Sequence, residues 1–357
     1  MHLLFDARVL QPHFPGIGRY ARALMEALVR VAPSLQLTLL TESRAERLPL
    51  PGARWVDAPS IFSAASQARV PLLARRVGAD LFHAPYYLYP YLVPLPTVVT
   101  IHDLIPLDYP EMIPGGMGRR LYRPLNVLAA RRAAHVLTDS EGARESILRH
   151  LRLPPERVTT VRLAPAPFFT AEPSVRRERF FFSLLSNKPH KNGARLIRAF
   201  ARTEPERHGV RLVLAGPHDP DWPAFEQVAA EAGVAEWVTV LGRVSEEALR
   251  EHYRRCLAFV FPSFAEGFGL PVLEAMACGA PTAIADASPM RDLAGEAALR
   301  FDPFDKSAIA VTLRRLLDEP ELRGNLSQKA ESRAAHFSWE RAARETFSIY
   351  ERVTRSK

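Results

Sequence analysis

The sequence predicts an α/β protein with two doubly wound parallel sheets, each in its own domain. The chain has 357 residues, which is enough for two domains of ordinary size. Short apolar runs alternate with longer helical stretches in both halves, as expected for parallel strands joined by crossover helices. A proline-rich segment, 163–173, lies between the two series and suits a linker better than a strand.

The order of these runs predicts the individual strands and helices. In the first half they fall at 2–5, 20–31, 35–40, 81–83, 97–101, 121–134, 135–138 and 143–151. The second half repeats the alternation at 180–185, 193–201, 211–215, 223–232, 238–241, 246–254 and 257–261. The stretch 339–353 has apolar residues at helical spacing and predicts a final helix.

This organisation predicts a Rossmann-like domain over 1–168, a second one over 175–336, and a terminal helix within 337–357. Doubly wound sheets bind their ligands beyond the carboxyl ends of the strands. We therefore expect the two domains to face one cleft.

The composition is that of an ordinary globular protein, with 47% hydrophobic residues. Every apolar run is broken before the roughly 18 residues of a membrane span, and the start, MHLLFDARVL, lacks the features of a signal peptide. We therefore expect a cytoplasmic protein. Cys256 and Cys278 form no metal-ligand pair and lie beside apolar runs, so we expect buried thiols and no disulfide.

The formal charge of +8 is compatible with anionic small molecules, an anionic membrane surface or nucleic acid. No signature of a nucleic-acid-binding module is present, which favours an anionic co-substrate and peripheral contact with the membrane. A solvated helix face remains the simpler explanation for a local basic cluster. The densest basic cluster consists of Arg119, Arg120, Arg123, Arg131 and Arg132.

The most informative segment, EGFGLPVLEAMACGAP, begins at Glu266 and follows a predicted buried strand. Pro271 suits the first turn of a helix and Gly279 the position just after its end. The amides of Phe268, Gly269 and Leu270 would then be available to phosphate or sugar oxygens, helped by the helix dipole.

Each of the two carboxylates of this segment has its own expected role. We place Glu274 in the first helical turn, where it would accept hydrogen bonds from a ribose diol, and Glu266 opposite the transferred sugar. A cap and a solvated side chain are the usual structural roles for glutamates near a helix start.

The two glutamates, with seven residues between them, closely resemble the signature of retaining glycosyltransferases of family 4 (group 1). This family includes sucrose synthases and bacterial mannosyltransferases. The resemblance implies the GT-B fold, with two facing Rossmann-like domains and a cleft between them. It also implies an acceptor-side N-terminal domain, a C-terminal domain that binds the nucleotide-sugar, and a final helix that crosses back to the N-terminal domain.

A polar loop, SNKPHKNG, follows the first strand of the second half and enters a helix. A fixed lysine there would stabilise the charge that a leaving diphosphate gains in the transition state. Lys191 matches the lysine that binds the diphosphate in the family, and Lys188 is a candidate assistant. Relatives often carry glycine or arginine around Leu185 and His190, so the second cation stays open. An exposed loop is the structural alternative.

Gly16 and Gly18 lie where a loop enters the first long helix, and they permit close approach of the backbone to phosphate. Together with Glu42 they also fit a dinucleotide-binding fingerprint, the basis of a rival oxidoreductase hypothesis. That fingerprint needs its first glycine directly after the strand, whereas 6–15 intervene here. In the family, the glycine that matches Gly16 approaches the diphosphate and Gly18 shapes the same loop.

His102 and Asp103 follow the predicted strand 97–101 and would face the cleft. A lone histidine is more often structural, but at a strand end it can donate to a sugar hydroxyl. The segment TIHDLIPLDYPE is similar to that of bacterial mannosyltransferases, whose histidine contacts the donor sugar. Asp103 would orient His102 or bind the acceptor.

The resemblance implies retaining transfer of a hexose, with mannose from GDP-mannose favoured and a UDP-sugar next, without a metal or other cofactor. The acceptor would be a saccharide or lipid-linked saccharide of bacterial surface polysaccharide or lipopolysaccharide. The alternatives are an NAD-dependent oxidoreductase, a retaining glycosidase, which leaves the lysine loop unexplained, and a silent nucleotide-sugar-binding protein. The predicted donor-binding residues are Gly16, Gly18, Lys188, Arg243, Val244, Gly267, Phe268, Gly269, Leu270 and Glu274, and the predicted catalytic residues are His102, Glu266 and Lys191.

Overall fold

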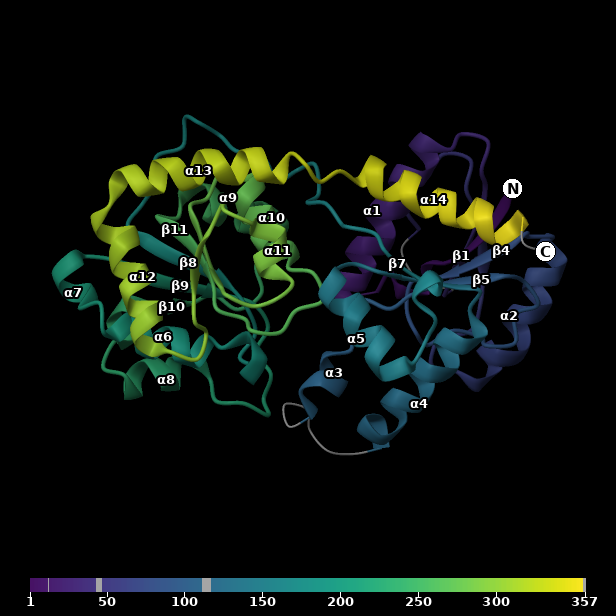
Figure 1. Cartoon of the computed structure of the whole chain (residues 1–357), viewed down its shortest axis with the longest axis horizontal. Helices are drawn as coiled ribbons and strands as arrows, with labels where there is room; N and C mark the ends of the chain where they lie inside the picture. Colours follow the sequence, from purple (N-terminus) through teal and green to yellow (C-terminus); the bar gives the residue numbers. More distant parts are fainter. Residues whose placement is uncertain (12, 43–46, 111–116, 356–357) are drawn as a thin grey trace. The chain divides into compact units, whose positions relative to one another are not determined.

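The structure is a computed structural model that describes residues 1–11, 13–42, 47–110 and 117–355, with only the backbone of residues 15 and 117–119. The chain forms two compact units (Figure 1). Unit 1 consists of Met1–Leu163 together with Ser338–Lys357, and unit 2 of Ala164–Phe337.

Unit 1 is built on a parallel sheet in the order β3-β2-β1-β4-β5-β6-β7. The order reverses between β1 and β4, and such switch points are where open α/β sheets bind ligands. The strands are β1 (His2–Asp6), β2 (Gln36–Thr41), β3 (Arg54–Asp57), β4 (Leu81–Ala84), β5 (Thr97–Thr100), β6 (His135–Thr138) and β7 (Val158–Thr160).

Helices cover both faces of this sheet (Figure 1). The first face carries α1 (Pro15–Val31) and α14 (Trp339–Arg355), which pack against each other. The second face carries α2 (Ala64–Val77), α4 (Met117–Arg132) and α5 (Glu141–Leu151), and the short α3 (Ile105–Asp108) precedes α4.

Buried hydrogen bonds attach α14 to the sheet of unit 1. The hydroxyl of Tyr350 bonds Nδ1 of His83 on β4, and Nε2 of His83 lies 2.9 Å from the hydroxyl of Thr100 on β5. Burial lowers the pKa of His83 to about 3, so the ring is neutral at physiological pH. Helix α14 is therefore attached to the core of unit 1.

Unit 2 has its own parallel sheet, in the order β10-β9-β8-β11-β12-β13, with its switch point between β8 and β11. Its strands are almost continuously apolar because both faces are covered. They are β8 (Phe180–Leu184), β9 (Arg211–Ala215), β10 (Val238–Val240), β11 (Ala258–Phe261), β12 (Thr282–Ala285) and β13 (Leu299–Phe301).

The helices of unit 2 form a layer on each face of its sheet (Figure 1). One layer consists of α6 (Gly193–Ala201), α8 (Phe225–Glu231) and α12 (Lys306–Asp318), and the short α7 (Pro205–His208) precedes β9. The other consists of α9 (Glu246–Arg255), α10 (Leu270–Ala277), α11 (Met290–Ala294) and α13 (Pro320–Ala334).

The predicted fold class is confirmed in each unit, since both sheets are parallel, doubly wound and covered by helices on both faces. Four strands, β3, β7, β12 and β13, were not predicted from the sequence. Strands β3, β7 and β13 have only three or four residues each and include polar side chains, which weakens a strand pattern. No helix of the described chain has both the length and the apolar character needed to span a bilayer.

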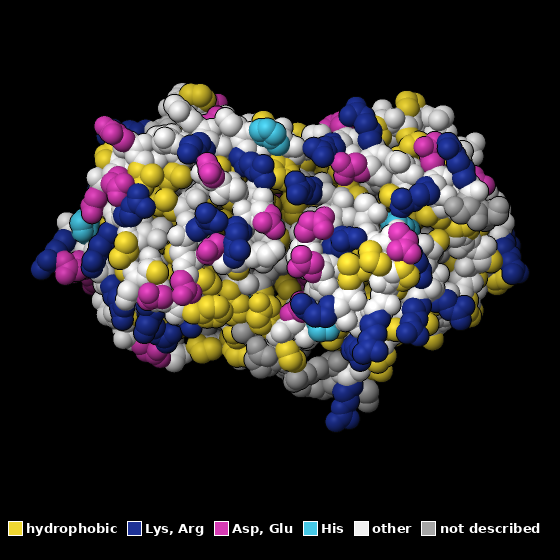
Figure 2. Space-filling view, in the orientation of Figure 1, with side chains coloured by type: hydrophobic (Ala, Val, Ile, Leu, Met, Phe, Trp, Pro, Cys, Tyr) yellow, Lys and Arg dark blue, Asp and Glu magenta, His cyan; other side chains and the backbone are white. Residues whose placement is uncertain are grey.

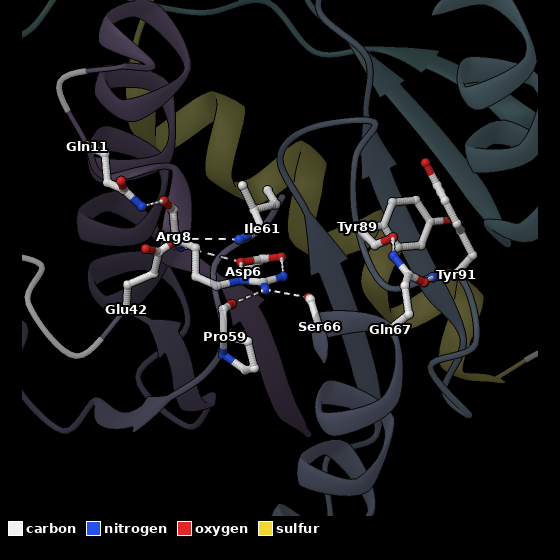
Figure 3. Close-up of polar contacts among 10 residues, drawn as sticks. All are labelled: Asp6, Arg8, Gln11, Glu42, Pro59, Ile61, Ser66, Gln67, Tyr89 and Tyr91. Atoms are coloured by element: carbon white, nitrogen blue, oxygen red, sulfur yellow. Dashed lines mark hydrogen bonds and ion pairs between the residues drawn. The ribbon is translucent and has the colours of Figure 1, made fainter. Parts of the chain in front are cut away.

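A buried ion pair fixes the carboxyl end of β1 (Figure 3). The guanidinium of Arg8 donates to both carboxylate oxygens of Asp6, at 2.7 and 2.5 Å, and both side chains are almost completely buried. Arg8 also donates to the carbonyl of Pro59 at 2.8 Å and to the hydroxyl of Ser66 on α2 at 2.6 Å. One side chain thus ties the loop after β1 to the segment after β3 and to α2.

Replacing Arg8 by Met should reduce the free energy of unfolding by about 3–5 kcal/mol, because it leaves the buried carboxylate of Asp6 without its partner. The matched control is Arg47→Met, which breaks the pair with Asp57 at 2.8 Å, where both side chains are about half exposed. This control should cost less than about 1 kcal/mol. Urea denaturation measures the free energy of unfolding of both variants. Equal losses in Arg8→Met and Arg47→Met would contradict a stabilising role for the buried pair of Arg8 and Asp6.

Candidate functional site

Two loops meet at the switch point of unit 2, one after β8 and one after β11. The carbonyl of His190 accepts hydrogen bonds from the amide of Phe264 and the hydroxyl of Ser263, both at 3.1 Å. The side-chain amide of Asn192 donates to the carbonyls of Pro262, at 3.1 Å, and Pro303, at 2.7 Å. The two loops are therefore held in one fixed arrangement.

The structure brings together Lys191 and Glu266, which the sequence places 75 residues apart. The ammonium of Lys191 lies 2.7 and 2.9 Å from the two carboxylate oxygens of Glu266. The side chains are 24% and 11% exposed, so both charged groups are largely shielded but remain reachable from solvent. A charge-assisted pair of this kind orients the lysine and leaves it able to meet an anion.

The other basic side chains of this loop are placed differently. Burial, together with the nearby charge of Lys191, lowers the pKa of His190 to about 4, so its ring is neutral at physiological pH. His190 therefore does not supply a second cation. The ammonium of Lys188 lies 3.4 Å from the carboxylate of Asp219 and is about half exposed.

The predicted helix limits in this region are confirmed. Gly269, with φ of 100°, precedes α10, Pro271 lies in its first turn, and Gly279, with φ of 72°, follows its end. Because α10 begins at Leu270, its first amides have no carbonyl partner within the helix. The positive end of the helix thus lies in the same loop as Glu266.

The predicted position of Glu274 is wrong in one respect. The positive φ of Gly269 sets the helix start at Leu270, which places Glu274 in the second turn of α10 rather than the first. Its side chain is almost completely buried, and the hydroxyl of Tyr253 donates to Oε2 at 3.3 Å. Its role toward a ribose stays a prediction.

A cavity of about 490 Å³ lies at the carboxyl ends of β8, β9 and β10. Leu241 and Gly242 line it, and Arg243 and Val244 follow them directly in the loop before α9. Gly216, with φ of 134°, also lines it, and any Cβ there would overlap the carbonyl of Leu185. The sequence signal for Gly216 is a glycine directly after the apolar strand 211–215, and Gly216 was not among the predicted site residues.

Asn187 closes one side of this cavity. Its amide nitrogen donates to the carbonyls of Asp219, at 2.8 Å, and Trp222, at 2.9 Å, and its oxygen accepts from the amide of Asp219 at 2.7 Å. The loops after β8 and β9 are thereby joined. Asn187 is a site residue that the sequence analysis missed.

In unit 1, His102 lies just beyond β5 and bonds Asp139, which follows β6. Nδ1 of His102 is 2.6 Å from the carboxylate of Asp139, and Nε2 is 3.1 Å from the carbonyl of Pro85. Both partners accept hydrogen bonds, so the ring satisfies both only when both nitrogens carry protons. Burial lowers the pKa of His102, but Asp139 and the other negative groups outweigh this effect and raise it above its ordinary value.

Asp103 was predicted to orient His102 or to bind an acceptor. The first role is wrong, because Asp139 bonds the ring, whereas Oδ1 of Asp103 accepts from the amide of Ile105 at 3.1 Å. The sequence signal for Asp139 was an Asp-Ser pair directly after the strand 135–138. The pairing itself joins residues 37 positions apart, so spacing alone does not reveal it.

Gly16 and Gly18 lie in the first turns of α1 rather than in a tight turn after β1. A Cβ at Gly18 would lie 3.1 Å from the carbonyl oxygen of Val9, so the glycine allows close packing of α1, whereas Gly16 has open space around its Cα. A 3-10 turn, Ala7–Val9, and a further loop separate β1 from α1. This arrangement differs from the dinucleotide-binding fingerprint, which disfavours the oxidoreductase alternative.

Two protein-family models match the chain. The model described as glycosyl transferases group 1 covers residues 168–333, and the model described as glycosyltransferase family 4 covers residues 15–163. O-antigen chain mannosyltransferase B of Escherichia coli is 29% identical over 98% of this chain and 99% of its own length. The MMP alpha-(1->4)-mannosyltransferase of Mycolicibacterium hassiacum is 30% identical over 83% of this chain and 75% of its own length.

Solved structures with the same fold cover nearly the whole chain. Sucrose-phosphate synthase from Thermosynechococcus elongatus has a TM-score of 0.82 at 18% identity and covers 100% of both chains. Anabaena HepE in complex with UDP-glucose has a TM-score of 0.77 at 16% identity and covers 98% of this chain and 99% of its own. At these identities the likeness establishes the fold, which is that of GT-B proteins.

The contact between His102 and Asp139 predicts a pH-dependent effect. Because the pair raises the pKa of His102 above 6.5, its stabilisation is complete below that pH and is lost as pH rises through the raised value. In Asp139→Asn the pKa should fall below 6.5, because burial then dominates. NMR titration of the imidazole nitrogens measures this, and an unchanged pKa in the variant would contradict the assignment.

Proposed function

The chain belongs to the family of group 1 glycosyltransferases and is a glycosyltransferase, and we propose that it transfers a mannosyl residue from a nucleotide-sugar to a saccharide acceptor with retention of configuration. The names of the two mannosyltransferase relatives support mannose as the transferred sugar. GDP-mannose is the favoured donor. A UDP-sugar is the second candidate, since the Anabaena neighbour was solved with UDP-glucose.

The observation that carries this proposal is the pair of Lys191 and Glu266 at the switch point of unit 2. During transfer the bond from the anomeric carbon to the diphosphate breaks, and negative charge develops on the leaving oxygen. The ammonium of Lys191 would stabilise that charge, because its position is already set by Glu266. The amides of Phe268, Gly269 and Leu270 and the α10 dipole would act on the same group.

The proposed reaction needs no nucleophile from the protein. The acceptor hydroxyl attacks the anomeric carbon from the face that the diphosphate leaves, and a departing phosphate oxygen takes the hydroxyl proton. One bond of the anomeric carbon, that to the diphosphate, breaks and one glycosidic bond forms. The products are the glycosylated acceptor and a free nucleoside diphosphate that has taken up the hydroxyl proton. The protein contributes orientation and charge stabilisation, without a metal or other cofactor in this proposal.

The cavity at the ends of β8, β9 and β10 would hold the base of the donor, next to Arg243 and Val244. A volume of about 490 Å³ is within the range of small-molecule sites. Glu274 remains the proposed partner of the ribose diol. In this role its carboxylate would lose the hydrogen bond from Tyr253 and accept one from the ribose instead. His102 would contact the donor sugar by exchanging its bond to Pro85 in the same way.

Unit 1 also has features that suit peripheral contact with an anionic membrane. On α4, Leu121 and Leu128 are 45% and 39% exposed and lie among exposed arginines, whereas the side chain of Arg119 lies outside the described residues. On the face drawn in Figure 2, basic side chains gather over the part of unit 1 that contains α4 and α5. We propose a lipid-linked acceptor and a cytoplasmic location at the membrane on this basis. The exposed arginines of α4 are Arg120, Arg123, Arg131 and Arg132.

The donor is identified by calorimetric titration with GDP-mannose, UDP-glucose and NAD, followed by NMR analysis of the product anomer. We expect binding of one nucleotide-sugar and a product with the anomeric configuration of the donor. Binding of NAD would favour the oxidoreductase alternative, and donor binding without hydrolysis or transfer would favour a silent binding protein. An inverted product would contradict the retaining mechanism.

Replacing Lys191 by Met should lower kcat by about 10²–10³-fold, because one preorganised donor to the leaving diphosphate is lost. The matched control is Lys329→Met, which removes an equal charge from an exposed position on α13 and should change kcat little. Steady-state kinetics with the identified donor measure both variants. A similar kcat in the two variants would show that Lys191 has no role in the reaction.

A further inference from the structure

Six aromatic rings form a continuous row in unit 1, which we call the aromatic track. They come from the loops that follow β1, β3 and β4 and from α4. The members of the aromatic track are His13, Phe14, Phe62, Tyr86, Tyr87 and Tyr122.

Each ring of the aromatic track touches the next. The centroid of Phe62 lies 5.6 Å from that of His13 and 5.8 Å from that of Phe14, and the planes of Phe62 and Phe14 are only 17° apart. Phe14 is 5.2 Å from Tyr86. Tyr86 is 4.4 Å from Tyr87, which is 5.3 Å from Tyr122. The spacing is close to the length of one sugar residue along an extended oligosaccharide.

Part of the aromatic track is open to solvent. Phe62 is 58% exposed, His13 is exposed, and Tyr86 and Tyr87 are half-buried, whereas Phe14 is buried beneath them. Phe62 and His13 therefore present exposed ring surface that rests on the buried ring of Phe14.

The aromatic track lies at the carboxyl edge of the sheet, where doubly wound folds bind ligands. Two of its segments follow β1 and β4, the two strands of the switch point in unit 1, and the segment of Phe62 follows β3. It also reaches the residues expected on the acceptor side. The hydroxyl of Tyr122 donates to the carbonyl of Asp103 at 3.3 Å, and Pro85, beside Tyr86, accepts the bond from His102.

The polar contacts drawn in Figure 3 hold the three segments that carry the exposed rings. Gln11 donates to the carbonyl of Arg8 at 2.7 Å, and its own carbonyl accepts from the amide of Phe14 at 2.9 Å. Arg8 holds Pro59 at 2.8 Å, and the amide of Ile61 donates to Glu42 at 3.3 Å, directly before Phe62.

Gln67 on α2 fixes the loop of Tyr86 and Tyr87 in the same way (Figure 3). Its side chain donates to the carbonyl of Tyr89 at 3.1 Å and accepts from the amide of Tyr91 at 3.0 Å. The hydroxyl of Tyr91 in turn donates to the carbonyl of Tyr87 at 3.2 Å. The rings are thus positioned before any ligand arrives, which reduces the entropy lost on binding.

We propose that the aromatic track binds successive pyranose rings of a saccharide acceptor, so that the acceptor is an oligosaccharide rather than a single sugar. This inference rests on the proposed function. The C–H groups on one face of a pyranose carry partial positive charge and suit the electron-rich face of an aromatic ring. The charged groups that act on Tyr86 and Tyr122 are the carboxylates of Asp103 and Asp108, which would repel a phosphate and therefore favour an uncharged sugar over a nucleotide.

The test uses Phe62→Ala in the full chain, with Phe304→Ala as a control of equal chemistry. Phe304 is 61% exposed and lies in unit 2. Saturation-transfer NMR and titration measure binding of a mannopentaose and of methyl α-mannoside, without any need for turnover. We expect Phe62→Ala to weaken mannopentaose binding about tenfold, Phe304→Ala to leave it unchanged, and Phe62→Tyr to restore it.

Donor binding and donor hydrolysis without acceptor serve as separate measurements of the proposed function. Donor affinity and the rate of donor hydrolysis should be the same in Phe62→Ala and the wild type. If the wild type shows neither donor binding nor hydrolysis, the proposed function is refuted, and the proposal for the aromatic track is judged by saccharide binding alone. Equal mannopentaose affinity in Phe62→Ala and the wild type would overturn the inference. So would an effect of Phe62→Ala confined to the binding of anionic phospholipid vesicles, which would identify the track as a membrane contact.

Discussion

The ion pair between Lys191 and Glu266 is the interaction on which the proposed chemistry of unit 2 depends. It joins the two loops that leave the adjacent strands β8 and β11, where the strand order of the sheet reverses. His190 and Asn192, which flank Lys191, form hydrogen bonds to the loop after β11, which carries Glu266. These bonds hold the backbones of the two loops together. Glu266 thus holds the ammonium of Lys191 in the free protein at the position where we propose that a diphosphate leaves.

Unit 1 also has loops that side-chain contacts hold in fixed positions, but these loops present a different kind of surface. A buried charged group, Arg8, fixes the ends of several loops at the carboxyl edge of its sheet, and Gln67 does so with neutral hydrogen bonds. The loops themselves carry aromatic rings rather than cations. One unit therefore offers a preorganised positive charge, and the other offers preorganised uncharged surfaces, which matches the different chemistry of a nucleotide-sugar and a saccharide.

The sequence predicted the fold because the alternation of apolar runs and helical stretches is local information. It also singled out Lys191 and Glu266, each from its own loop after a strand, but it did not show that they contact each other. Asp139 and Asn187 were missed because their partners lie more than 30 residues away along the chain. Glu274 was assigned to the wrong turn because the helix start at Leu270 depends on the positive φ of Gly269, a backbone angle that the residue pattern does not specify. The aromatic track joins four separate segments, so no single stretch of sequence reveals it.

The most direct test of the central claim is calorimetric binding of GDP and UDP to Glu266→Gln, with guanosine and uridine as controls without phosphate. If Lys191 is the partner of the diphosphate and Glu266 holds it in the free protein, removing the competing carboxylate charge should strengthen binding of the diphosphate several-fold. The affinity of the nucleoside should not change. Weaker diphosphate binding, or an equal change for the nucleoside, would contradict the account.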